Sequence, residues 1–134
     1  MGKLQEFLMD AEIGTTQTEV QIAPFPFPFV IRSITEAENK AIRKTCQKVE
    51  FDKKTRQKRI DTDTDLYNAR LVAACCIGPN FKDADFQAKK GVRGAEDLIN
   101  LVLNPGQYTD LLLAVQEING FTDDVNELRD EAKN

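Results

Sequence analysis

The stretch of residues 94–121 constrains the fold more than any other, because two apolar stripes at helical spacing flank a well-marked break. The first stripe is Leu98, Leu101 and Val102. The second stripe is Tyr108, Leu111, Leu112, Val115 and Ile118. Apolar residues three and four apart lie on one helix face, so each stripe needs a surface to pack against. The pattern predicts a helical hairpin whose two helices share one partner surface.

The break between the stripes carries helix-ending and helix-starting residues. Asn104 can cap a helix, Pro105 suits the first helical position, and Gln107 lies where a capping-box side chain reaches back. At the other end, Gly120 can adopt the left-handed conformation that closes a helix, and Phe121 can fold back onto the last turn. One helix therefore ends near residue 103 and a second runs to about residue 119.

Composition argues against several classes of enzyme. The chain has no histidine, which excludes Ser-His-Asp and Cys-His nucleophiles and histidine-based zinc sites. No glycine-rich phosphate loop follows a strand, and the carboxylates fall at helix starts or on exposed faces. Cys46, Cys75 and Cys76 form no spaced motif, so we interpret them as reduced, buried thiols. We predict no catalytic residues, no cofactor and no metal.

The charge distribution is uneven although the net charge is only −4. Half of the basic residues lie in residues 40–59, while both ends of the chain are acidic. No apolar run approaches the roughly 20 residues of a membrane-spanning helix, and residues 1–18 do not resemble a secretory signal. We therefore expect a cytoplasmic protein that does not contact membranes.

The N-terminal part predicts a helix followed by a β-hairpin. Residues 2–9 form a short amphipathic helix that either covers the core or detaches to bind a partner, and residues 1–18 are expected to be loose. Residues 19–22 and 29–34 read as two strands that pair within a hairpin spanning residues 19–34. Between them lies FPFPF, whose aromatic rings, among them Phe25 and Phe27, either tuck into the core or form an exposed edge for a partner.

The middle of the chain predicts a surface helix and then a basic loop. A capping box at Thr35 and Glu38 begins a helix that reaches about Lys48, with Ala41, Ile42 and Cys46 toward the core. Residues 49–60 contain KKTRQKR, which we predict to be a solvated loop. The competing interpretation is that residues 53–59 contact nucleic acid or an acidic protein face, although no aromatic residues for base stacking are interleaved.

Three further helices complete the pattern. Carboxylates at residues 61–65 cap a helix over residues 65–77 and fail as a calcium loop, which needs glycine where Leu66 stands. A short helix capped by Asp83 and closed by Gly91 follows, and Thr122 begins a last, acidic helix with a thin apolar stripe at Val125 and Leu128. The predicted fold is one α+β domain over residues 1–134, predominantly α, in which residues 35–134 form a small helical bundle.

Three segments of the chain resemble a known family. They are PFVIRSITEAENKAIRKTC, LVAACCIGPNFKDADFQ and GVRGAEDLINLVLNPGQYTDLLLAVQEINGF. Their order is similar to that in the XkdN-like phage tail assembly chaperones of prophages and tailed phages. None of these segments is a catalytic signature, and FPFPF and KKTRQKR look peculiar to this chain.

The resemblance implies a chaperone that binds the tape measure protein, keeps it soluble and assists tail tube polymerisation, and that is absent from the mature virion. It also implies contact with the tail tube protein and self-association into a homo-oligomer. The alternative from the residues is a small nucleic-acid-binding regulator that uses residues 53–59. We predict that partner helices bind along the second hairpin helix and the last helix, with the Phe-Pro loop as a second contact. The residues expected to contact a partner are Tyr108, Leu112, Val115, Phe121, Val125, Leu128, Phe25 and Phe27.

Overall fold

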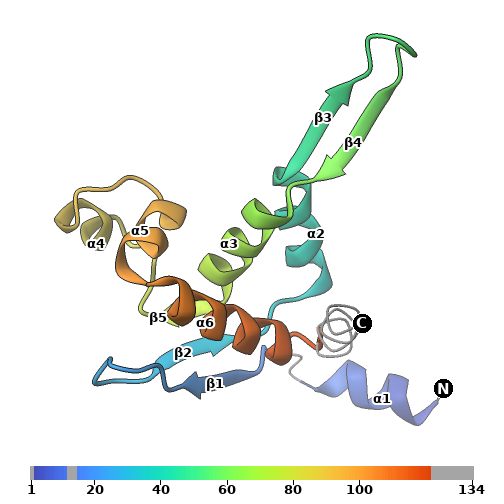
Figure 1. Ribbon diagram of the computed structural model, residues 1–134. Coiled ribbons are helices and arrows are strands. Elements are labelled where there is room, and N and C mark those ends of the chain that lie inside the picture. Colours follow the sequence, from blue (N-terminus) through green and yellow to red (C-terminus); the bar gives the residue numbers. More distant parts are fainter. Residues whose placement is uncertain (1, 12–14, 122–134) are drawn as a thin grey trace, which may run out of the picture.

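The computed structural model of the chain describes residues 2–11 and 15–121 and shows a mixed α+β fold (Figure 1). The helices in these residues are α1 (Lys3–Asp10), α2 (Glu36–Thr45), α3 (Thr64–Cys75), α4 (Ala84–Lys89), α5 (Ala95–Val102) and α6 (Pro105–Ile118). The strands are β1 (Gln17–Val20), β2 (Phe29–Arg32), β3 (Gln47–Phe51), β4 (Lys58–Thr62) and β5 (Cys76–Gly78). The α+β prediction is confirmed, while a helical bundle over residues 35–134 describes only part of that region, because three strands interrupt it.

Helix α3 lies at the centre of the core. Four of its residues are at most 4% exposed: Leu71, Val72, Ala73 and Cys75. These residues cover more than half of the circumference of the helix, so α3 needs neighbours on several sides. Helices α2, α5 and α6 and strand β5 pack around it. The helix begins where the sequence predicts, with the Asp63 carboxylate accepting a hydrogen bond of 3.2 Å from the backbone N–H of Leu66.

The predicted break between α5 and α6 is confirmed. The side chain of Asn104 accepts a hydrogen bond from the N–H of Gln107 at 2.8 Å, and the Gln107 side chain accepts one from the N–H of Asn104 at 2.9 Å. Both helices pack on α3, which is thus a shared partner surface, and α6 also lies against strands β1 and β2. The prediction was wrong for one residue of the first stripe, because Leu101 is 56% exposed and Ile99 is the buried residue instead.

The C-terminal end of α6 has the predicted glycine closure. Gly120 has a φ of 82°, its N–H donates to the carbonyl of Glu117, and the N–H of Phe121 donates to the carbonyl of Gln116. Phe121 is half-buried against the core, so it does fold back. Asn119, which the sequence analysis missed, accepts a hydrogen bond of 2.9 Å from the N–H of Ile34 and thereby joins α6 to the segment after β2.

The predicted pairing of the first two strands is confirmed, but the sheet has a third strand. β1 and β2 are antiparallel, with Val20 opposite Phe29, and β5 pairs with the other edge of β2. The helix predicted to reach Ile77 ends at Cys75. Residues Cys76–Gly78 instead form β5, whose pairing with the edge of β2 satisfies backbone groups that the helix would otherwise have bonded.

Helix α2 contacts α3 through fewer apolar residues than predicted. Cys46 is buried and Ile42 half-buried, as expected, whereas Ala41 is exposed. A polar residue that the sequence analysis missed completes the contact. Asn39 is buried, and its side-chain carbonyl accepts a hydrogen bond from the hydroxyl of Tyr67 on α3. This bond satisfies a buried polar group and fixes the two helices side by side.

The predicted loop over residues 49–60 is instead a β-hairpin. Helix α2 ends at Thr45 and not near Lys48, and β3 and β4 then form a two-stranded antiparallel sheet of their own. Opposite charges face each other across it, Glu50 opposite Arg59. The alternation of charged residues with Val49 and Phe51 was the signal for a strand. Figure 1 shows the hairpin (green) extending beyond α2 and α3, away from the three-stranded sheet.

Candidate partner-binding surface

The Phe-Pro loop between β1 and β2 divides its aromatic rings between core and solvent. Phe29 is buried, Phe25 is half-buried with its ring centroid 5.3 Å from that of Phe29, and Phe27 is 77% exposed. A largely apolar groove of about 400 Å³ lies between this loop and the residues Gly78, Pro79, Phe86 and Val102. The two sequence interpretations therefore each hold for part of the loop, with Phe27 on the exposed edge.

A second groove is built from α3, α5 and α6. It has a volume of about 580 Å³, and Tyr108 and Leu112 of α6, both half-buried, form part of its wall. Burial, and then the charge of Asp65, raises the pKa of the Tyr108 phenol. Lys48 and Asp63 form an ion pair of 3.6 Å at its rim. The groove thus has a mostly polar and charged lining, in which Tyr108 and Leu112 are large apolar side chains.

The structure does not unite the residues predicted to bind a partner. Val115 is fully buried, so it offers no side chain to a partner. Phe121 lines a separate recess with Ile34 and Thr35 at the start of α2. Val125 and Leu128 lie outside the described residues. The described candidates therefore fall on three distinct surfaces, because they come from different elements of the fold.

Helix α1 presents an apolar surface that is not covered. Leu4, Phe7, Leu8 and Met9 are between 45% and 70% exposed, and none of the residues of α1 is buried. Of the two predicted alternatives, a helix that covers the core does not hold for the described residues. The amphipathic helix forms as predicted. The sequence pattern does not show, however, whether the surface that would cover its apolar face belongs to the same chain.

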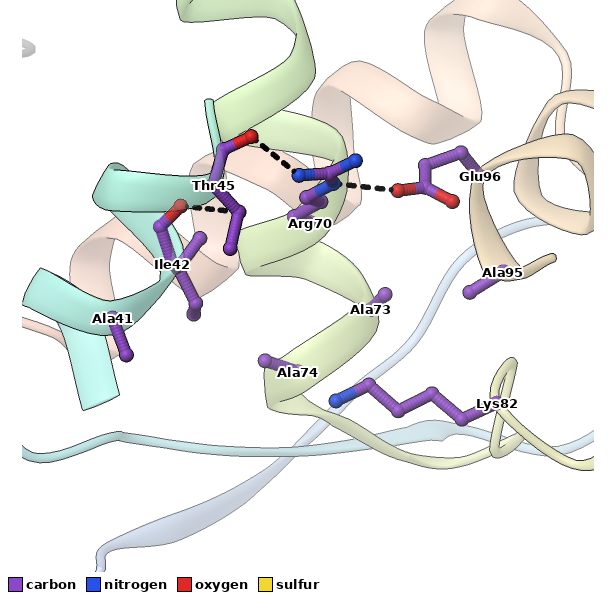
Figure 2. Close-up of a pocket in the computed structure, with 9 residues that line it drawn as sticks. All are labelled: Ala41, Ile42, Thr45, Arg70, Ala73, Ala74, Lys82, Ala95 and Glu96. Carbon is purple, nitrogen blue, oxygen red and sulfur yellow. Dashed lines mark hydrogen bonds and ion pairs between the residues drawn. The ribbon is translucent and has the colours of Figure 1, made fainter. Parts of the chain in front are cut away.

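Sequence reasoning also missed a shallow hollow between α2, α3 and α5, shown in Figure 2. Figure 2 shows Arg70 reaching both ways across it, with Nε 2.9 Å from the Glu96 carboxylate and Nη1 2.8 Å from the carbonyl of Thr45. Because Arg70 donates a hydrogen bond to it, the pKa of Glu96 lies below its ordinary value. Much of the remaining lining is alanine. Arg70 thus joins α3 to the end of α2 and to the first turn of α5.

The cysteines behave as buried apolar side chains, as predicted. All three are free and buried. Burial, with a smaller contribution from Cys75, raises the pKa of Cys76 to about 12, so its reactive thiolate form is suppressed at neutral pH. Among residues 2–11 and 15–121, no three acidic or cysteine side chains gather as metal ligands would. None of the helices described is long and apolar enough to cross a membrane.

Comparison with known proteins assigns the family. The family model for the phage XkdN-like tail assembly chaperone protein matches residues 4–133. The chain is 29% identical over 109 residues to the phage-like element PBSX protein XkdN of Bacillus subtilis (strain 168), covering 80% of this chain and 72% of that protein. It is also 29% identical over 111 residues to the uncharacterized protein YqbN of the same strain, with the same coverage of both chains.

A solved structure supports the fold. The crystal structure of a protein YqbN matches with a TM-score of 0.66 at 20% identity, covering 85% of this chain and 93% of that one. At that identity the likeness concerns the fold alone. The class that the comparisons define is a phage tail assembly chaperone. The chain belongs to the XkdN-like tail assembly chaperone family, which is not a class of enzymes.

Proposed function

We propose that this chaperone binds the tape measure protein of its phage, keeps it soluble and assists the tail tube protein in polymerising around it. Membership of the tail assembly chaperone family supports a role in tail assembly. A very long helical client would aggregate through its apolar faces before the tube encloses it. A small protein that covers those faces would prevent this.

The observation that carries the proposal is the amount of large apolar surface left open. Helix α1 exposes four large apolar side chains, and Phe27 stands out from the Phe-Pro loop. Exposed apolar groups on this scale mark interaction sites, because a soluble protein otherwise covers them. The exposed face of α1 and the groove beside Phe27 are the surfaces that we assign to the client. The groove at Tyr108 and Leu112 would receive a further client helix.

Co-expression with a tagged tape measure protein tests this assignment. We expect Phe7→Ser and Phe27→Ser each to reduce the amount of chaperone recovered with the client several-fold. Leu101→Ser is the matched control, since Leu101 is a similarly exposed apolar residue on α5 that does not line the groove beside Phe27. Circular dichroism verifies that every variant folds.

Two results would contradict the proposal. One is recovery of the folded Phe7→Ser/Phe27→Ser double variant at the level of the unchanged chain. The other is a tape measure protein that stays soluble to the same extent when the chaperone is left out. We further propose that the protein acts in the host cytoplasm and leaves before the virion is complete, which mass spectrometry of purified virions tests by the absence of its peptides.

The alternative function is nucleic-acid binding through residues 53–59. The structure places Lys53, Lys54 and Arg56 exposed at the tip of the β3–β4 hairpin, which is the observation that favours it. Retention on DNA at low salt that disappears when these residues are neutralised would support this function. Elution of the unchanged chain without retention would remove it.

A further inference from the structure

The β3–β4 hairpin has one apolar face that no described part of the chain covers. Val49 lies directly opposite Ile60 in the pairing register, and Phe51 follows two residues later on the same face. These three side chains are between 57% and 64% exposed. A two-stranded hairpin is marginally stable without a covering element, so this face is suited to an occupant.

The opposite face of the hairpin needs no partner. Lys48 lies across from Asp61, and Glu50 lies across from Arg59. The Nε atom of Arg59 is also 3.0 Å from the Asp61 carboxylate along its own strand. Charges on this face therefore compensate one another, and the uncovered surface of the hairpin is the apolar one.

The tip end of the apolar face is positively charged. Lys58 lies opposite Phe51 on that face, and the turn beyond it carries Lys53, Lys54 and Arg56. None of the four ion pairs found among the described residues involves these basic side chains. An occupant that fits must therefore have an apolar stripe with an acidic edge.

Residues 122–134 of the chain have that pattern. They lie outside the described structure, and their sequence, TDDVNELRDEAKN, predicts an amphipathic helix. Val125 and Leu128 lie on one face of such a helix. Asp124, Glu127 and Glu131 lie along one side of Leu128 at helical spacing, which gives the stripe an acidic edge.

We propose that the apolar face of the β3–β4 hairpin binds residues 122–134 of a second copy of this chain. Val125 and Leu128 would cover Val49, Phe51 and Ile60, and the acidic edge would face the basic tip. The contact joins different surfaces of the two copies, so it either closes reciprocally into a dimer or continues into a longer assembly.

The distances favour a second copy over the chain's own residues 122–134. Phe121 lies in a recess with Thr35 and Asn39, near the start of α2, whereas the hairpin begins after the end of α2. Helix α2 has 10 residues and is therefore about 15 Å long, and Phe51 lies about 13 Å further along β3. Figure 1 shows the hairpin continuing away from α2. The four steps of chain from Phe121 to Val125 span at most about 14 Å, which is about half of that path.

Sedimentation velocity of the full chain over a range of concentrations tests the proposal. We expect the unchanged chain to self-associate, and Phe51→Ser and Leu128→Ser each to raise the dissociation constant at least about tenfold, as the loss of a central apolar anchor does. Leu101→Ser is the matched control, because Leu101 is 56% exposed and Phe51 is 57% exposed. It should leave the dissociation constant unchanged.

Two further measurements test the specific pairing. Mixing the Phe51→Ser and Leu128→Ser chains should restore a heterodimer, since each brings the half-site that the other lacks. Lys58→Glu should weaken association, and Glu131→Lys in the same chain should restore it in part. Because these readouts do not involve the tape measure protein, they are independent of the proposed function.

The proposal is overturned by any of three results. The unchanged chain could remain monomeric at several hundred micromolar. The Leu128→Ser chain could associate as strongly as the unchanged chain. The mixed variants could fail to form a heterodimer although each remains folded by circular dichroism.

Discussion

Replacing Asn119 by alanine should test how α6 is joined to the rest of the fold. The side-chain carbonyl of Asn119 accepts a hydrogen bond of 2.9 Å from the backbone N–H of Ile34. Its amide group donates to the carbonyl of Val115 at 2.8 Å and to the sulfur of Cys75 at 3.4 Å. One half-buried amide therefore links three segments that are distant in the sequence.

The expected loss comes mainly from the N–H of Ile34. This donor would lose its partner in a half-buried position, which costs about 1–3 kcal/mol, while the carbonyl of Val115 keeps its bond from the backbone N–H of Asn119. We therefore expect Asn119→Ala to lower the free energy of unfolding by about 2 kcal/mol. For a domain of this size, that corresponds to a fall in Tm of roughly 8 °C.

Urea unfolding followed by far-ultraviolet circular dichroism is the suitable assay, because the chain has no tryptophan. With a slope near 2 kcal/mol per molar urea, the midpoint should fall by about 1 M. Asn100→Ala is the control, since Asn100 is exposed and its replacement should change stability by less than about 0.5 kcal/mol. A change for Asn119→Ala no larger than that of the control would refute the reasoning.

Three other perturbations follow from the structure. Asn104→Ala should lower the free energy of unfolding by about 1 kcal/mol, because it removes the N-cap of α6, and thermal unfolding measures this. The pKa of Glu96 is lowered by Arg70, so the stability that its charge contributes is complete above the ordinary value of 4.5 and is lost as the pH falls through the folded pKa. Unfolding curves at pH 7 and pH 3 should thus show the deficit of Glu96→Gln shrinking at the lower pH. The free cysteines should react with a thiol reagent far more slowly in the native chain than in denaturant, and rapid native labelling of Cys76 would contradict its burial.

The exposed faces of the β3–β4 hairpin and of α1 differ in their chemistry. The exposed face of α1 offers apolar side chains. The hairpin combines apolar side chains with basic side chains at its tip that take part in none of the ion pairs among the described residues. Variants in Phe7 and Phe51 therefore separate recovery of the client from self-association. If both variants lost both properties, the two surfaces would belong to a single interface.

The sequence alone determined those features that depend on neighbouring residues. The capping of α3 by a carboxylate within residues 61–65, the capping box of Asn104 and Gln107, and the glycine closure at Gly120 were all predicted from the sequence. Hydrogen bonds between residues two to five positions apart set these features, so a short stretch of chain contains all the information. The free, buried cysteines were predicted in the same way, from residue type within an apolar pattern.

Only the tertiary structure decided which apolar faces find a partner within the chain. Strand β5 forms because the edge of β2 is available, and Val115 is buried where α6 packs on α3, β1 and β2. The same kind of pattern at Phe7 and at Phe51 leaves the side chains exposed. Periodicity in the sequence specifies that a face is apolar. The residues that pack on that face lie far away in the sequence or belong to another molecule, so the spacing of neighbouring residues does not identify them.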